Sequence, residues 1–476
     1  MFRGEGIKVF YFQDIILLPV YLIAILLIAY LYRNFRYENS PLKKYFIPGL
    51  AIRIVGALSL GIIYLFYYNG GGDTFYYYKD ANAFNLALQR SYSAFFDLLF
   101  LRSNEITMNT YEYTRGVTYF HDPSGWMSDK IYGLLSVLTF HSYPAMSVLI
   151  AALSFTGAWV LLKTFVSMYP QLTTPLAWAV LFVPSVFFWG SGILKDSITF
   201  GCLGWVTYSS HQIFFKRRNI ISNSLILLVT GYIALEVKAY IIISFIPALL
   251  LWIFLTYRKR ISNQFLRVMA GPSVLAIAIG FGFLMVNRLG AEFEQFSLQN
   301  VISTSERFQQ WHGYLAENAN ASGYSLGHID GSWTSIISKI PVAVNVTLFR
   351  PYLWEANNSV MLIAALESIF IMGFTLYILY KNGIGRIVVS IFSNPDLFFC
   401  FFFAIVFSFA VGFTSYNFGA LVRYKIPCIP FFLVGLIVLN HLTKVERQRK
   451  QKEKMHLRKR QPFIRTAKDA PLATVE

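Results

Sequence analysis

Long apolar blocks separated by short polar turns make up most of the chain. Each block holds roughly 17–25 residues, enough for one helix to cross a hydrocarbon core about 30 Å thick. Backbone groups at that depth have no water to bind, so a crossing segment must be a helix or a strand of a closed barrel. Barrel strands alternate polar and apolar residues, and these blocks do not. The pattern therefore predicts an all-α, polytopic transmembrane helix bundle.

About eleven spans are predicted from these blocks. They cover residues 13–33, 45–68, 143–166, 174–192, 197–215, 219–235, 239–257, 268–288, 357–380, 396–416 and 423–442. Two larger loops, 69–130 and 289–356, separate them. Segment 80–100 is expected to form an amphipathic helix at the membrane interface. Segment 131–141 is apolar but short, which predicts a re-entrant or interfacial piece.

Basic residues in the short loops predict the orientation, because cytoplasmic loops carry an excess of Lys and Arg. The basic residues follow the first, fifth, seventh and ninth spans, and alternate counting puts all of them on one face. They are Arg33, Arg36, Lys43, Lys44, Lys216, Arg217, Arg218, Arg258, Lys259, Arg260, Arg267, Lys381 and Arg386. The N-terminus is then outside, the C-terminus is cytoplasmic, and both larger loops are extracytoplasmic.

Composition and charge agree with a membrane protein. Hydrophobic residues make up 56% of the 476 residues and charged residues only 14%, where soluble domains carry about a quarter charged. The net charge is +17, and residues 444–476 hold eleven Lys and Arg against four Asp and Glu. Directly after a membrane helix, such a segment favours the anionic lipids of the cytoplasmic leaflet over nucleic acid. We predict a transmembrane domain over 1–442 and a disordered basic tail over 443–476.

Cysteines and histidines indicate no metal centre. Cys202, Cys400 and Cys428 lie inside apolar blocks without metal or disulfide spacing, which is typical of small buried hydrophobic residues. His121-Asp122 and His312 are isolated in the sequence.

The sharpest motif, Gly70-Gly71-Gly72-Asp73-Thr74, begins where the second span ends. Three glycines let the backbone turn tightly and approach a ligand closely. Asp73 then lies at the outer membrane boundary, where it could act as a general base towards a sugar hydroxyl or ligate Mg²⁺ or Mn²⁺. The structural alternative is a turn with Asp73 as a helix N-cap. Asp80 closes the motif and is assigned to substrate binding.

Two turns between the middle spans add charges at the same boundary. Lys195-Asp196 separates two spans with almost no loop, and charges at that depth are expected to pair or to face a wet cavity. Asp196 can cap the next helix, and Lys195 can bind phosphate as a point charge. Glu236 and Lys238 form the next outer turn, with Lys238 as a second phosphate contact. Ordinary solvated turns are the structural alternative.

Two later segments carry arginines at the outer boundary. Arg350 and Glu355 join the second large loop to the ninth span, and a bidentate arginine there suits a phosphate, with an Arg–Glu structural pair as the alternative. Arg423 opens the last span against the positive-inside bias, which indicates a ligand such as a phosphate-linked sugar. Snorkelling to anionic lipid is the alternative. Asn417 and Tyr424 flank Arg423 and are assigned to substrate binding.

Acidic and basic residues from five hairpins or loops thus lie at one membrane boundary. The large outer loops are also rich in Tyr, Trp, Asn, Ser and Gly. Aromatic rings stack on sugars and amides bond hydroxyls, although interfacial aromatic belts have a similar composition. A mixed cluster of this kind fits a phosphate-bearing lipid donor together with a base.

This layout resembles the GT-C superfamily of integral membrane glycosyltransferases, of the bacterial kind that uses polyprenyl-phosphate sugars. Gly72-Asp73-Thr74 looks like the segment that holds the acidic catalytic residue in the family's first large outer loop. Lys195-Asp196 resembles its short outer turn between middle spans. Arg423-Tyr424 with Pro427 and Pro430 resembles the opening of a late span. The chain departs from the family in having a span before the usual first helix and in lacking a clean Asp-Glu pair.

The resemblance implies transfer of a sugar from a polyprenyl-phosphate donor to a glycan, lipid or protein acceptor, on the extracytoplasmic face of the bacterial cytoplasmic membrane. Asp73 would be the catalytic base. Donor phosphate would be bound by Lys195, Arg350, Arg423 and Lys238, and substrate by Asp80, Asp196, Glu236, Glu355, Tyr424 and Asn417.

Three other functions stay open: a polysaccharide polymerase or ligase, a lipid-linked glycan transporter or flippase, and a structural subunit that binds a partner through its basic tail. A transporter needs polar residues at mid-membrane depth. Arg53 is the clearest of these, and its side chain is long enough to extend towards the inner surface.

Overall fold

The computed structural model describes residues 10–258, 261–265, 323–327 and 332–468, with isolated positions between 269 and 280. All regular elements in this part of the chain are helices, and its only sheet-like contact is one isolated bridge between Gly323 and Asn417. The all-α prediction is therefore confirmed. The predicted span 268–288 and most of the loop 289–356 lie outside the described residues.

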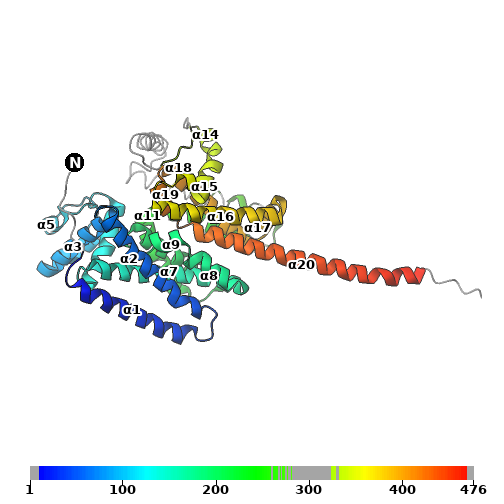
Figure 1. Ribbon diagram of the computed structural model, residues 1–476, viewed down its shortest axis with the longest axis horizontal. Helices are drawn as coiled ribbons and strands as arrows, with labels where there is room; N and C mark the ends of the chain where they lie inside the picture. The colour runs from blue at the N-terminus through cyan, green and yellow to red at the C-terminus, as the bar shows by residue number, and fades with distance from the viewer. Residues whose placement is uncertain are drawn as a thin grey trace, which may run out of the picture.

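Seven of the described helices are long and apolar enough to cross a membrane, as a multi-pass membrane protein requires. They are α1 (Asp14–Tyr37), α2 (Lys43–Phe66), α7 (Tyr143–Met168), α11 (Ile220–Tyr257), α16 (Ser359–Asn382), α18 (Pro395–Thr414) and α20 (Ile429–Lys468). Figure 1 shows α1 along one edge of the molecule and α20 leaving it as a single long helix. Shorter helices fill the space between these seven.

Helix α11 folds back on itself at Lys238, the one non-helical residue among its 38. A continuous helix of that length would be about 57 Å long. Instead both ends lie beside the same segment: α11 begins just after Phe215, whose ring is 4.3 Å from that of Trp252 near the other end. The Tyr257 hydroxyl also donates to the carbonyl of Phe214. Its two halves match the predicted spans 219–235 and 239–257. We call the two ends of the bundle the Lys238 end and the Tyr257 end.

Helix α10 (Lys195–His211) runs between these two ends and continues into a π-helical turn, Gln212–Lys216. Close packing against α7 fixes its position, because a Cβ on Gly157 would overlap the backbone of Gly201. Glycines at such a contact let two helix backbones approach each other within a membrane. This pair holds the first turn of α10, with Asp196, firmly in place.

The predicted span 174–192 is broken into α8 (Thr173–Leu181) and α9 (Pro184–Trp189). Pro184 ends the first helix and begins the second. The buried carboxylate of Glu367 on α16 meets the free N-terminus of α9, accepting from the Ser185 amide at 2.7 Å and its hydroxyl at 2.6 Å. A carboxylate is favourable at that end of a helix dipole. The polar groups at the N-terminus of α9 therefore have hydrogen-bond partners inside the protein, as backbone within a membrane requires.

The loop 69–130 folds into helices of its own. They are α3 (Asp73–Arg90), α4 (Tyr92–Phe100), the single turn α5 (Tyr111–Thr114) and the start of α6 (Pro123–Leu138). The predicted amphipathic helix 80–100 is two helices, because Ser91 ends α3 and caps α4 by accepting from the Ala94 amide at 3.2 Å. Segment 131–141 is not a separate piece but the end of α6. A small core of aromatic rings, including Phe84 and Trp126, joins α3 to α6.

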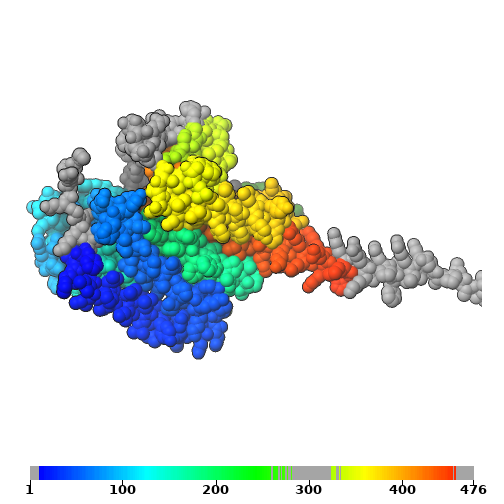
Figure 2. Space-filling model, viewed as in Figure 1, coloured from blue at the N-terminus to red at the C-terminus, as the bar shows by residue number. Residues whose placement is uncertain are grey.

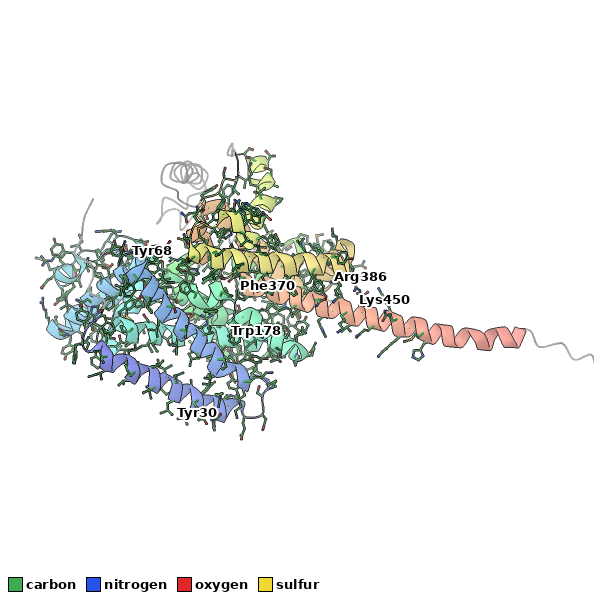
Figure 3. The ribbon with its side chains drawn as sticks, viewed as in Figure 1. Tyr30, Tyr68, Trp178, Phe370, Arg386 and Lys450 are labelled. Atoms are coloured by element: carbon green, nitrogen blue, oxygen red, sulfur yellow. The ribbon has the colours of Figure 1, made fainter. Side chains whose placement is uncertain are left out.

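The C-terminal part begins at residue 332. It contains α14 (Trp333–Ser338), α15 (Ile340–Phe349), the turn Leu353–Glu355, α16, α17 (Ile384–Ser393), α18, α19 (Phe418–Tyr424) and α20. Figure 3 shows Arg386 near Lys450, where α20 leaves the other helices, and shows Tyr68, which follows α2, away from both.

Two features differ from the sequence-based expectations. Arg53 does not extend to a surface: it is fully buried, and its Nη1 donates to the Gly190 carbonyl at 2.8 Å and to Ser154 at 3.0 Å. Residues 443–468, expected to be disordered, continue α20 as a helix. Lys, Arg, Gln and Glu are good helix formers, and Glu446–Lys450 and Arg449–Glu453 are spaced to pair along it.

Candidate active site

Arg423 joins two carboxylates from distant parts of the chain at the Lys238 end. Its Nη1 donates to Asp73 at 2.9 Å, and its Nη2 and Nε donate to Asp196 at 2.9 and 3.2 Å. The second oxygen of Asp196 accepts from Lys238 Nζ at 2.6 Å. We call these four residues the Arg423 cluster. Two acids and two bases neutralise one another, so the cluster is held together by charge-assisted hydrogen bonds.

The tri-glycine motif delivers Asp73 to this cluster. Gly70 and Gly72 have φ angles of 75° and 105°, which residues with a Cβ rarely adopt. A Cβ on Gly72 would also overlap the ring of Tyr64. The N-cap of α3 is Gly72, so Asp73 is the first helical residue and not the cap. Likewise Asp196 is the second residue of α10, whose N-cap is Leu194.

The two carboxylates on Arg423 differ in exposure. The Asp73 side chain is 41% exposed, whereas that of Asp196 is 2% exposed and both its oxygens are bound to cations. Arg423 itself is 14% exposed. Asp196 therefore lies beneath the arginine and fixes it, and Asp73 is the carboxylate that a molecule in solution can reach.

Tyr119 and Asp80 support Asp73 from the α3–α6 region. The Tyr119 hydroxyl donates to the other oxygen of Asp73 at 3.1 Å. Asp80 accepts from the Thr118 and Tyr119 amides at 2.8 and 3.3 Å, so it holds the loop that carries Tyr119. Burial raises the pKa of Tyr119, and the neighbouring Asp73 raises it further, so its proton stays on the hydroxyl.

Lys195 lies next to this group but binds another acid. Its Nζ is 3.0 Å from Asp122 and 5.8 Å from the centre of the Tyr119 ring. Asp122 also caps α6 by accepting from the Ser124 amide at 3.1 Å. Asp122 looked isolated in the sequence, although the Asp-Pro-Ser order is a helix-start signal that could have placed it. Tyr119 carries no pattern that would have identified it.

Asp129 on α6 is a buried acid that sequence reasoning missed. It is fully buried, and neither of its side-chain oxygens has a hydrogen-bond partner in the described part of the chain. Burial raises its pKa well above the usual value, and the charge of Asp80 adds to this. Burial thus favours the neutral, protonated form of this side chain over the carboxylate.

A cavity of about 590 Å³ is lined by Arg423 and by Gly72, the residue that precedes Asp73. It lies between the end of α2, the start of α16 and α19. Aromatic rings and amides form much of its lining, with Tyr64, Tyr68, Trp189, Asn357, Asn358 and Asn417 around Gly72 and Arg423. Figure 3 shows Tyr68 at this end of the bundle. Leu362, Ile363 and Leu366 of α16 are exposed, so apolar surface flanks the cavity. The space thus has polar, aromatic and apolar walls.

Some predicted residues lie outside the Arg423 cluster. Arg350 and Glu355 form a bidentate pair with each other, and Arg350 lies 5.0 Å from the centre of the Phe418 ring. Buried Lys425 reaches the Arg350 carbonyl at 3.1 Å, which links this pair to the segment of Arg423. Glu236 is exposed on α11 and lies close to Lys130 and Tyr232.

Asn417 and Tyr424 lie as predicted near Arg423. Asn417 lines the cavity and caps α19 by accepting from the Ala420 amide at 3.2 Å. The Tyr424 ring lies 4.5 Å from Lys238 Nζ and shields it from water. Within the described residues, no group of three or more His, Cys, Asp or Glu is placed to hold a metal ion. Comparison of the chain with protein-family models, curated proteins and solved structures gives no match.

Proposed function

We propose that this protein is a membrane glycosyltransferase that transfers a sugar from a polyprenyl-phosphate donor to a glycan, lipid or protein acceptor on the extracytoplasmic face of a bacterial cytoplasmic membrane. The supporting observation is the Arg423 cluster. The cluster contains an accessible carboxylate, Asp73, and an arginine, Arg423, that is held in place by Asp196. Arg423 also lines a cavity whose other lining residues include aromatic rings and amides. A phosphate suits the arginine, rings and amides suit a sugar, and the flanking apolar helices suit a lipid chain.

The chemistry assigned to the site needs one base and one cation. The acceptor hydroxyl oxygen attacks the anomeric carbon while the bond from that carbon to the donor phosphate breaks. The phosphate leaves with the electron pair, and Asp73 takes the acceptor proton. Arg423 stabilises the charge on the leaving phosphate, and Asp196 with Lys238 holds the guanidinium in place.

Phosphate binding also activates the base in this scheme. Without donor, Arg423 is bound to Asp73 at 2.9 Å. A donor phosphate competes with Asp73 for the exposed side of the guanidinium and cannot compete for the side held by buried Asp196. Asp73 is then released towards the acceptor. Lys195 is positioned to assist, whereas Arg350, Glu355 and Asp80 are assigned to supporting the site.

The topology belongs to the same proposal. The two halves of α11, together with α10 and the broken α8–α9 pair, add to the remaining long helices and the span 268–288 to give eleven crossings. The N-terminus is then outside and the Lys238 end is extracytoplasmic. Cysteine labelling of Ser93→Cys, at an exposed position of α4 in the loop 69–130, from the outer side of intact cells tests this orientation.

Asp73→Asn tests the chemistry directly. We expect transfer from a polyprenyl-phosphate sugar by the purified protein to fall by about 10²–10⁴-fold, as for loss of a general base, with unchanged expression and with donor binding at least as tight as in the wild type, because the competing carboxylate is gone. Asp97→Asn is the matched control, because Asp97 is an exposed acid in the same loop region. Full activity of Asp73→Asn would remove Asp73 from the mechanism. Transfer in detergent micelles also separates an enzyme from a flippase, and product length separates a single transfer from polymerisation.

A further inference from the structure

A second cavity, of about 480 Å³, lies away from the Arg423 cluster, at the Tyr257 end of the bundle. Its walls come from α1, α7, α10 and the start of α11. Helix α1 forms the outermost wall, and Figure 2 shows it on the surface of the molecule. Most of α1 is exposed in this structure, so the cavity lies just beneath the surface that membrane lipid would cover.

The lining of this cavity changes from apolar to polar along its length. Ile25, Ala152 and Phe155 line one part of it, and Lys163 with Ser222 lines the other. Ala152 and Lys163 are both on α7, eleven residues apart, which corresponds to roughly 16 Å along a helix. The cavity thus has the polarity and the length of the upper part of a lipid, with a headgroup region and the first half of an acyl chain.

Lys163 lines the polar part of the cavity, and a second cation, the exposed Arg36, lies near it outside the lining. Lys163 Nζ lies 5.0 Å from the centre of the Tyr208 ring. Arg36, at the end of α1, is close enough to act electrostatically on both Lys163 and Tyr208. Within the described part of the chain neither cation forms an ion pair, although charges near membrane depth are expected to have partners.

We propose that this cavity binds one anionic glycerophospholipid. An acyl chain lies between α1 and α7, and the phosphate is bound by Lys163 and Arg36. Basic pockets between transmembrane helices on the cytoplasmic side bind anionic lipid headgroups in this way. The polar part of the cavity lies at the Tyr257 end, where α10 is followed by the basic residues Lys216, Arg217 and Arg218. The site depends on the membrane topology and not on the transferase chemistry, because it shares no residue with the Arg423 cluster.

Native mass spectrometry of the full chain, released from nanodiscs of mixed phosphatidylglycerol and phosphatidylcholine, tests the proposal. We expect one phosphatidylglycerol adduct that survives activation after other lipids are lost. Two basic residues near a membrane contribute about 1 kcal/mol each, so Arg36→Ala with Lys163→Ala should weaken the adduct on the order of thirty-fold. The matched control is Lys216→Ala with Arg218→Ala, which removes the same charge from exposed positions outside the cavity.

A steric variant separates the cavity from the charges. Ala152→Phe fills the apolar part and keeps both cations, and we expect it also to lose the retained adduct. Correct folding of each variant is checked by its melting temperature in the same detergent. Equal retention of phosphatidylcholine, or equal adducts in the cavity variants and the control, would overturn the proposal. Because the measurement needs no sugar transfer, its outcome is independent of the test of Asp73.

Discussion

The two cavities of this protein treat positive charge in opposite ways. At the Lys238 end, Arg423 and Lys238 are bound by Asp73 and Asp196, and the group is neutral before any ligand arrives. At the Tyr257 end, Lys163 and Arg36 have no acid against them within the described residues, and an aromatic ring is the only close partner of Lys163. A ligand of the first site must displace an internal partner, whereas a ligand of the second supplies the missing one.

This difference in pairing predicts that the first site exchanges a bound anion and that the second site retains one. A site whose cations are already paired can release a bound anion, because the internal carboxylate returns to its place. A site with unpaired cations binds an anion and keeps it. The first arrangement suits a donor that arrives and leaves in each cycle, and the second suits a resident lipid that stabilises the fold.

The largest expected effect comes from removing the buried acid of the paired site. Asp196→Ala leaves Lys238 without an acid and leaves Arg423 with only the half-exposed Asp73, and we expect the free energy of unfolding to fall by about 3–5 kcal/mol. Thermal unfolding in detergent measures this. Asp73→Asn is the comparison, because its half-exposed pair should change stability by less than about 1 kcal/mol. Equal losses of unfolding free energy in the two variants would mean that burial does not distinguish the contribution of Asp196 from that of Asp73.

A smaller effect, with a definite sign in pH, is expected at Asp129. Its pKa is raised by burial, so between the usual value of 3.8 and the raised one the folded state keeps a proton that the unfolded state has lost. Stability therefore falls as the pH rises from the unfolded pKa to the folded one, by about 1.4 kcal/mol for each pH interval of one between them.

Asp129→Asn keeps the shape and removes the charge. We expect the stability of this variant to lack the decline that the wild type shows as the pH rises above the unfolded pKa of 3.8. Asp80→Ala is the control, because it loses the bonds from the Thr118 and Tyr119 amides and should be less stable throughout. If the stability of Asp129→Asn declined with rising pH as steeply as that of the wild type, a group other than Asp129 would cause the decline.

At the unpaired site the expected effect depends on the surroundings. In neutral detergent, Lys163→Met should leave the melting temperature unchanged or raise it, because no acidic partner is lost and the methionine can still pack against the Tyr208 ring. Added phosphatidylglycerol should stabilise the wild type by an amount that grows with the logarithm of lipid concentration, about 2.7 kcal/mol at a hundredfold excess over Kd. The variant should gain less than the wild type at every concentration. A loss of stability in neutral detergent would reveal an internal partner for Lys163.

The smallest effect is expected for an ion pair that is open to solvent. Arg90 and Glu112 are 2.6 Å apart with more than half of each side chain exposed. Glu112→Gln should change the free energy of unfolding by less than about 1 kcal/mol, because solvent screens the pair. Thermal unfolding of Glu112→Gln in the same buffer as Asp196→Ala allows the two changes in unfolding free energy to be compared directly. A change as large as that of Asp196→Ala would mean that exposure does not separate the two kinds of pair.

Much of this arrangement could be predicted from the sequence. Apolar block length indicates membrane helices, and charges in alternate turns must return to the same boundary. That reasoning is enough to group Asp73, Asp196, Lys238 and Arg423, which the structure places in contact. It also predicts the turn at Lys238, where α11 folds back.

The remaining details depend on packing between elements, which leaves no periodic signal. Tyr119 and Asp129 lie in a region of short helices, and only the folded contact of α3 with α6 brings them behind Asp73. Arg53 is long enough to reach a surface, and only the closeness of the Gly190 carbonyl shows why it does not. For Arg350 the sequence left both a phosphate contact and a pair with Glu355 open, because it does not specify the geometry of the turn between them.

The sequence separation within the Arg423 cluster has a consequence for biosynthesis. Asp196 precedes Lys238 by 42 residues and Arg423 by 227, and Asp73 precedes Arg423 by 350. A ribosome therefore delivers both carboxylates long before the guanidinium that joins them. Nascent chains and chains truncated before α19 lack this arginine, so the Arg423 cluster can assemble only after residue 423 has been synthesised.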